Sequence, residues 1–104
     1  MLRIYAEILA VIPQLVPVLT AIEQKDSDLG RQGRRALTSV PLNTAEASYS
    51  RGRNRAARYH TAAGSAREVI SVLETAQAFG HIPPVDATLM NQLFKIVATL
   101  FKNT

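Results

Sequence analysis

The sequence predicts an all-α protein, an antiparallel up-down-up-down four-helix bundle with a kinked second helix. Apolar residues recur every three to four positions in four successive segments, and no stretch alternates polar and apolar residues as a half-buried strand does. Short turn-like segments separate the four, which favours antiparallel neighbours. With 104 residues, 47% hydrophobic and 19% charged, the chain fits a single domain over residues 1–104 and is too apolar for disorder.

The first helix is expected at about residues 2–24. Its apolar stripe is nearly twice as wide as a bundle helix needs, so another subunit is expected to cover the outer side. Pro13 and Pro17 predict a bend, because each removes a backbone donor. The stripe consists of Ile4, Tyr5, Ile8, Val11, Ile12, Leu15, Val18, Leu19 and Ile22, with a second line of Leu2, Leu9 and Val16.

The second helix is expected at about residues 27–49, after a turn at 25–28. Pro41 is expected to point away from its apolar face and to kink the helix without ending it, because the pattern continues in phase. The alternative is a break at Pro41 into two shorter helices. The face is lined by small and apolar residues that allow close helix approach, namely Leu29, Gly33, Ala36, Val40, Thr44 and Ala47.

Residues 50–54 are the tightest turn signal in the chain. The third helix follows at about 55–79, with Gly80 as its C-terminal cap. A connector at 81–84 leads to the last helix, at about 85–102. The inward stripes are expected to be Tyr59, Ala62, Ala63, Ala66, Val69, Ile70, Leu73 and Ala76, then Leu89, Met90, Leu93, Phe94, Ile96, Val97, Leu100 and Phe101.

The positive charge is concentrated in the middle of the chain. Twelve Lys and Arg against eight Asp and Glu give a net charge of +4 and a pI near 10.0. Residues 31–67 hold eight arginines and one acid, Glu46, whereas both ends are slightly acidic. This pattern indicates a polyanion-binding surface for RNA or DNA. The alternative is a solvated face with arginines that pair with carboxylates of neighbouring helices or subunits.

Six arginines are candidate nucleic-acid ligands, because they are expected on the outer side of the second helix and around the turn into the third. Tyr49 and Tyr59 flank them and are candidates to stack on a base. An aromatic content of only 6% favours backbone contacts over base-specific recognition. The six are Arg31, Arg34, Arg51, Arg53, Arg55 and Arg58.

A regular polar line runs beside the apolar face of the second helix, through Gln32, Arg35, Ser39, Asn43 and Glu46. Arg35 and Glu46 lie about three turns apart, too far to pair with each other. Arg35 is expected to pair with Glu68 of the third helix. Alternatively, Arg35 or Glu46 is expected to pair with a residue of a neighbouring subunit. The functional alternative is a ligand-binding groove along this line.

No constellation in the sequence predicts an enzyme, a metal site, a cofactor or a small-molecule substrate. There are no cysteines, which favours a reducing cytoplasm, and His60 and His81 lie in different segments without metal-ligand spacing. No phosphate-binding glycine loop or histidine-activated serine is present. Glu46 and Glu68, the only candidate acid–base carboxylates, are interpreted as arginine partners. Polar residues and prolines interrupt the first apolar segment, so no signal peptide or membrane segment is expected.

Two motifs resemble those of a known family. Residues 32–36 (QGRRA) and 39–46 (SVPLNTAE) resemble the Q-x-R-R-A-x-x-S-V-P-x-N-x-A-E core of four-helix bundle proteins encoded by intervening sequences in bacterial 23S rRNA genes. A second signature is matched by Tyr59, Ala63-Gly64-Ser65, Glu68 and Gly80-His81-Ile82. The resemblance covers about residues 29–82.

Three positions depart from this pattern. Gly33 stands where the family usually has leucine, Thr44 where it has isoleucine, and Ala47 where it has glycine. The first two thin the core face, and the third indicates that the helix continues. The first helix also lacks the tryptophan-bearing opening that is common in the family.

The resemblance implies a four-helix protomer and suggests a homopentamer with a central channel. It also implies distant kinship with accessory proteins of diversity-generating retroelements, which are basic pentamers that bind a reverse transcriptase and nucleic acid. We therefore expect a non-enzymatic, cytoplasmic homo-oligomer that serves as an RNA-binding or ribonucleoprotein accessory module. The alternative is a protein-interaction scaffold whose arginines serve subunit contacts.

Overall fold

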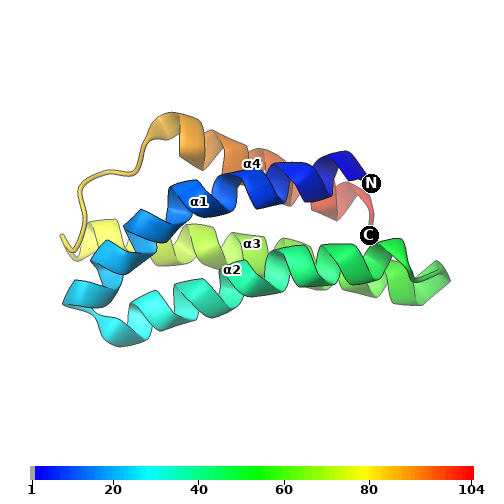
Figure 1. The fold of residues 1–104 in the computed structure, drawn as a ribbon, viewed down its shortest axis with the longest axis horizontal. Coiled ribbons are helices and arrows are strands. Elements are labelled where there is room, and N and C mark those ends of the chain that lie inside the picture. Colours follow the sequence, from blue (N-terminus) through cyan, green and yellow to red (C-terminus); the bar gives the residue numbers. More distant parts are fainter. Residues whose placement is uncertain (1) are drawn as a thin grey trace.

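Four helices form the protein, as a computed structural model that describes residues 2–104 shows. They are α1 (Leu2–Lys25), α2 (Ser27–Ser48), α3 (Gly52–Ala78) and α4 (Ala87–Lys102), and no strand occurs in the described residues. In Figure 1 each helix runs back alongside the preceding one, so both chain ends lie at the same end of the molecule. The prediction of an all-α, four-helix protein is confirmed.

The helix ends follow from local capping. Asp26, the single residue between α1 and α2, accepts a hydrogen bond from the Leu29 amide at 3.0 Å, and Asp86 accepts one from the Leu89 amide at 3.1 Å. Because Asp86 caps α4, this helix begins two residues later than predicted. Gly80 ends α3 as predicted, with a φ of +74° that favours glycine.

The turn between α2 and α3 is shorter than the sequence predicted. The helix α3 begins at Gly52 and therefore includes most of the predicted turn at 50–54. Gly52 has a φ of +59°, and a Cβ built on it would meet nothing within 4 Å, so backbone conformation is what favours glycine there. The reversal is made by the three residues from Tyr49 to Arg51.

The core contains the predicted inward stripes almost completely. Ile8, Leu15 and Leu19 of α1 are at most 1% exposed, and so is Tyr59 of α3. Phe94 was predicted to face inward but is 50% exposed. The core is therefore built mainly of aliphatic residues, with alanines of α3 where α2 and α3 approach closely.

The helix α2 continues without interruption through Pro41, so the alternative of two shorter helices is wrong. The expectation that Pro41 points away from the apolar face is wrong as well, because its side chain is buried. Its ring lies one turn after the buried Leu37 and extends the packed face of α2. The bend at Pro41 stays a prediction.

The outer side of α1 keeps part of its apolar surface exposed. Leu9 is 43% and Val16 38% exposed. The segment Arg3–Lys25 has a mean hydropathy of 1.7, and by length and composition alone it could cross a membrane. One face of this segment nevertheless packs into the bundle, with Ile4, Ile8, Val11, Leu15, Leu19 and Ile22 buried.

Candidate nucleic-acid interface

The end of the bundle formed by the α2–α3 reversal carries four exposed arginines, which we name the basic turn: Arg51, Arg53, Arg55 and Arg58. The hydroxyl of Ser50 donates to the Glu46 carbonyl at 2.9 Å, and the Asn54 amide donates to that hydroxyl at 3.3 Å. These bonds hold the backbone that presents the arginines. No ion pair involves any of the four within residues 3–104.

The early start of α3 separates arginines that the sequence places together. Arg53 and Arg55 lie within one helical turn, and a spacing of two residues directs them about 200° apart around the axis. The Arg55 guanidinium lies 5.7 Å from the centre of the Tyr59 ring. The basic turn therefore presents cations on two sides of the bundle end instead of one compact patch.

The two flanking tyrosines have opposite environments. Tyr49 is 88% exposed, so its ring is available to stack on a base. Tyr59 is 1% exposed and belongs to the core, so its predicted stacking role is wrong. Tyr59 lies on the inward stripe of α3, as its helical spacing predicted, and this stripe packs into the core.

The centre of the predicted polar line joins α2 to α3. The Asn43 side-chain amide donates to the Ser39 hydroxyl at 2.9 Å, and the Ser65 hydroxyl of α3 donates to the same oxygen at 2.8 Å. The Asn43 carbonyl oxygen accepts from Arg58 at 3.3 Å. Ser39, Asn43 and Ser65 are half-buried, so these hydrogen bonds help to fix how α2 and α3 pack. They also orient the Arg58 side chain toward α2.

The rest of the polar line faces solvent. Gln32, Arg35 and Glu46 are exposed, and so is Glu68. The expected Arg35–Glu68 pair is not formed within the described chain, because the ion pairs there join other residues. Pairing of Arg35 or Glu46 with a neighbouring subunit stays a prediction.

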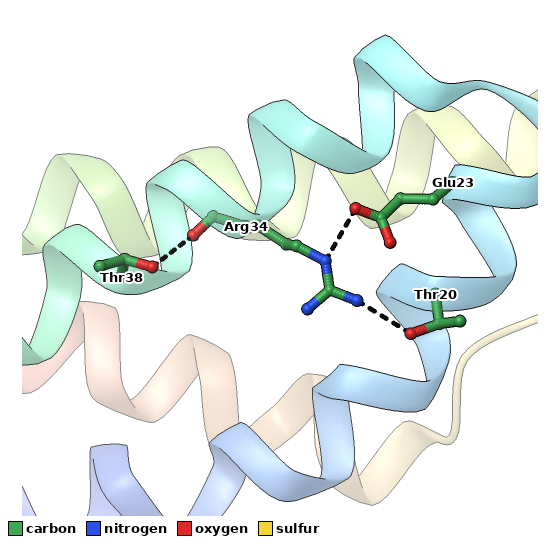
Figure 2. A network of polar contacts seen from close by, with 4 residues as sticks. All are labelled: Thr20, Glu23, Arg34 and Thr38. Atoms are coloured by element: carbon green, nitrogen blue, oxygen red, sulfur yellow. Dashed lines mark hydrogen bonds and ion pairs between the residues drawn. The ribbon is translucent and has the colours of Figure 1, made fainter.

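Arg34 is a structural residue in this fold. Figure 2 shows its guanidinium between two side chains of α1: Nε–H donates to Glu23 at 2.8 Å, and Nη2–H donates to the Thr20 hydroxyl at 2.9 Å. The hydrogen bond from Arg34 lowers the pKa of the Glu23 carboxyl, and the carboxylate raises the pKa of Arg34 in return. Arg31 is exposed and lies 3.4 Å from Asp28, one turn earlier on α2.

A groove between α1 and α4 gathers cations that sequence reasoning missed. It has a volume of about 800 Å³, and its lining includes Arg3, Lys95 and Lys102 together with Arg55 of the basic turn. The available signal was the spacing of Lys95 and Lys102, which places them on one helical face. The chain reversal that brings α1 beside α4 is a property of the tertiary structure.

The histidines are engaged with aromatic and acidic neighbours. The His60 ring lies 5.9 Å from the Phe101 ring, edge to face, and His81 stacks on Phe79 at 5.4 Å. His81 Nε2 also lies 3.9 Å from Asp26. Among residues 3–104, no cluster of three or more His, Cys, Asp or Glu side chains is placed to hold a metal. The interactions that the basic turn and the groove can offer a ligand are therefore attraction of anions by arginine and lysine and, at Tyr49, stacking on an exposed ring.

Comparison with known proteins gives one match. A family model described as "23S rRNA-intervening sequence protein" matches residues 2–102, almost the whole chain. No curated protein and no solved structure matches the sequence.

Proposed function

The chain belongs to the 23S rRNA-intervening sequence protein family, and we propose that it is a non-enzymatic, homo-oligomeric protein that binds nucleic acid, foremost RNA, as an accessory module of a ribonucleoprotein. The observation that carries the proposal is the basic turn. Its four arginines are exposed at one end of the bundle, and no carboxylate pairs with them in residues 3–104. Arginines without a carboxylate partner are available to phosphates, and this holds best for Arg51 and Arg53, because Arg58 donates to Asn43 and Arg55 lies over the Tyr59 ring.

Two further features support binding that does not depend on the base sequence. Tyr49 stands beside the basic turn with 88% of its surface exposed, which suits sequence-tolerant stacking on a base. Aromatic residues make up only 6% of the chain, so charge supplies most of the recognition. We expect salt-sensitive binding with little sequence preference.

The proposal includes assembly into a homopentamer, which the family resemblance suggests. Large apolar side chains on several helices support a contact between copies: Leu42 is 60%, Phe94 50% and Leu9 43% exposed. These side chains would lose exposure to water in a contact between copies, which is favourable. A ring would repeat the basic turn in every subunit and produce a basic belt. Native mass spectrometry measures the copy number directly.

The second candidate function is a protein-interaction scaffold without nucleic acid. Arg34 favours it, because this candidate ligand is bound to Glu23 and Thr20 of the neighbouring helix. Arg31 also has a carboxylate nearby, at 3.4 Å. If other arginines pair in the same way across subunit contacts, the positive charge serves assembly alone.

Fluorescence anisotropy with a structured RNA and a DNA duplex, from about 50 to 200 mM salt, tests the first proposal. We expect the logarithm of the binding constant to fall linearly with the logarithm of the salt concentration. The Arg51→Ala/Arg53→Ala variant, at unchanged oligomer size, is expected to bind more weakly and with a shallower slope. A control with the same charge loss is Lys25→Ala/Arg35→Ala, because both residues are exposed and lie outside the basic turn.

Three outcomes are informative. Loss of affinity in the Arg51/Arg53 variant alone supports the basic turn as the interface. An equal loss of affinity in both variants would mean that the effect comes from net charge and not from the basic turn. No binding by the wild-type protein at about 50 mM salt would overturn the proposal and leave the scaffold.

A further inference from the structure

We propose that the groove between α1 and α4 binds a single-stranded segment of nucleic acid, with phosphates on its cationic rim and a base against its floor. The inference rests on the proposed function and adds to it the class of nucleic acid and the path of the strand. None of the groove's cations except Arg55 belongs to the arginines that the sequence singled out.

The groove has the size and lining of a ligand-binding site. Its volume is about 800 Å³, within the range of about 300–1,000 Å³ that holds ligands of drug size. The floor is apolar, because Ile4, Val11 and Ile96 line it and are each at most 6% exposed. Of the helix pairs that pack side by side, α1 and α4 make the loosest contact, which leaves the groove open.

The rim carries four exposed cations, Arg3, Arg55, Lys95 and Lys102, against one carboxylate, Glu7. No ion pair joins Glu7 to any of them within the described residues. A fixed excess of positive charge beside low-dielectric walls raises the local concentration of anions. The rim of the groove therefore attracts phosphate groups.

The cations also follow a path. Lys95 and Lys102 lie seven residues apart on one face of α4, which separates them by about 10 Å along the helix, the length of about three stacked nucleotides. Arg55 belongs to both the groove and the basic turn. A strand that leaves the groove past Arg55 thus comes next to Arg51, the residue four positions earlier that precedes α3.

The apolar floor selects a single strand over a duplex. In a duplex the bases are paired inside and only the backbone and groove edges face a protein. An unpaired base, in contrast, can turn out of the strand and lie against apolar side chains. Only a single strand can therefore use the cationic rim and the floor together.

The test compares a labelled single strand with a duplex of the same length in anisotropy titrations across salt concentrations. Lys102→Ala is expected to reduce the magnitude of the single-strand salt slope by about 0.7, and Lys95→Ala/Lys102→Ala by about 1.4. Lys25→Ala is the matched control, because Lys25 and Lys102 are each the basic residue in the last turn of a helix. It is expected to leave the slope unchanged.

A steric variant separates the groove from its charge. Ala98→Trp fills the groove from an exposed position of α4 without changing any charge, whereas Ala6→Trp places the same side chain on the exposed surface of α1 outside the lining. We expect Ala98→Trp to weaken single-strand binding and to leave duplex binding unchanged. The Ala6→Trp control is expected to bind both as the wild type does.

The results that overturn the inference differ from those that overturn the proposed function. Unchanged single-strand binding in the lysine and Ala98→Trp variants, with reduced binding in the Arg51/Arg53 variant, would remove the groove and keep the function. A change of oligomer size in Ala98→Trp would make the groove a subunit contact. Absence of binding to any nucleic acid by the wild type would remove both.

Discussion

Arg34 of α2 donates its Nε–H to the Glu23 carboxylate of α1 at 2.8 Å, and this ion pair joins two helices separated by one residue (Figure 2). Gly30 allows the approach, because a Cβ on it would lie 2.9 Å from the Cα of Glu23. The Arg34 side chain is 41% and the Glu23 side chain 32% exposed, so water screens the attraction in part. Arg34, a candidate nucleic-acid ligand by sequence, thus holds α1 and α2 together instead.

We predict that the Arg34–Glu23 pair makes stability depend on pH. Because the pKa of Glu23 is lowered in the folded state, the pair stabilises the protein above the ordinary carboxyl pKa of 4.5, and this contribution is lost as the pH falls through the lowered folded value. Arg34→Ala should therefore lower the urea midpoint at pH 7, and the difference from wild type should shrink toward pH 3. Arg35→Ala is the control, because Arg35 is exposed and makes no ion pair within the described residues. An equal difference at both pH values would contradict the prediction.

Gly33 is predicted to be required for packing. A Cβ there would lie 2.6 Å from Cδ2 of Leu19 and 3.1 Å from Cγ1 of Val72, and both side chains are buried. Gly33→Ala should lower the free energy of unfolding by about 1–3 kcal/mol, measured by urea denaturation. Gly64 is the opposite case, since a Cβ there meets nothing within 4 Å in an exposed stretch of α3. Gly64→Ala should raise the stability by about 0.5–1 kcal/mol, and the same sign for both variants would refute the packing argument.

The Ser39 hydroxyl is predicted to matter more than the charges beside it. It accepts from both Asn43 and Ser65, so Ser39→Ala should cost about 0.5–1.5 kcal/mol in chemical denaturation. Arg35→Ala and Glu68→Ala remove exposed residues without an ion pair in the described chain, and each should change stability by less than about 0.5 kcal/mol. A larger loss accompanied by a smaller assembly would instead place these charges at a subunit contact.

Asp86 is predicted to be the cap that starts α4. Its carboxylate accepts from the Leu89 amide, and Asp86→Ala should cost about 1 kcal/mol by thermal or urea unfolding. Asp86→Asn keeps the accepting oxygen and should retain most of the stability. Equal losses in both variants would assign the effect to charge rather than to the hydrogen bond.

The helices and most of the core could be predicted from the sequence because they depend on local spacing. The stripe through Ile8, Leu15 and Leu19 follows the helical period and is buried as expected. Helix boundaries were less accurate where a side chain or a glycine conformation decides them. Asp86 delays α4 by two residues, and the conformation of Gly52 advances α3 by three.

The candidate site could be predicted only in part. The basic character of residues 31–67 is a count, but whether an arginine is free depends on what the fold places beside it. Arg34 meets Glu23 eleven positions earlier, and Arg58 meets Asn43 fifteen positions earlier. Tyr59 is in the core because it lies on the inward stripe of α3, although its position beside the arginines in the sequence suggested stacking on a base.

The sequence by itself determined the helical class, the four apolar stripes and the membership of the family, since periodicity and motif are properties of neighbouring positions. Only the tertiary structure decided which cations remain available. Four helices that reverse direction bring Arg3 of α1 beside Lys102 of α4, although 98 residues lie between them in the chain. Charges so far apart in sequence acquire a common field only when the helices pack, because electrostatic interaction depends on distance in space.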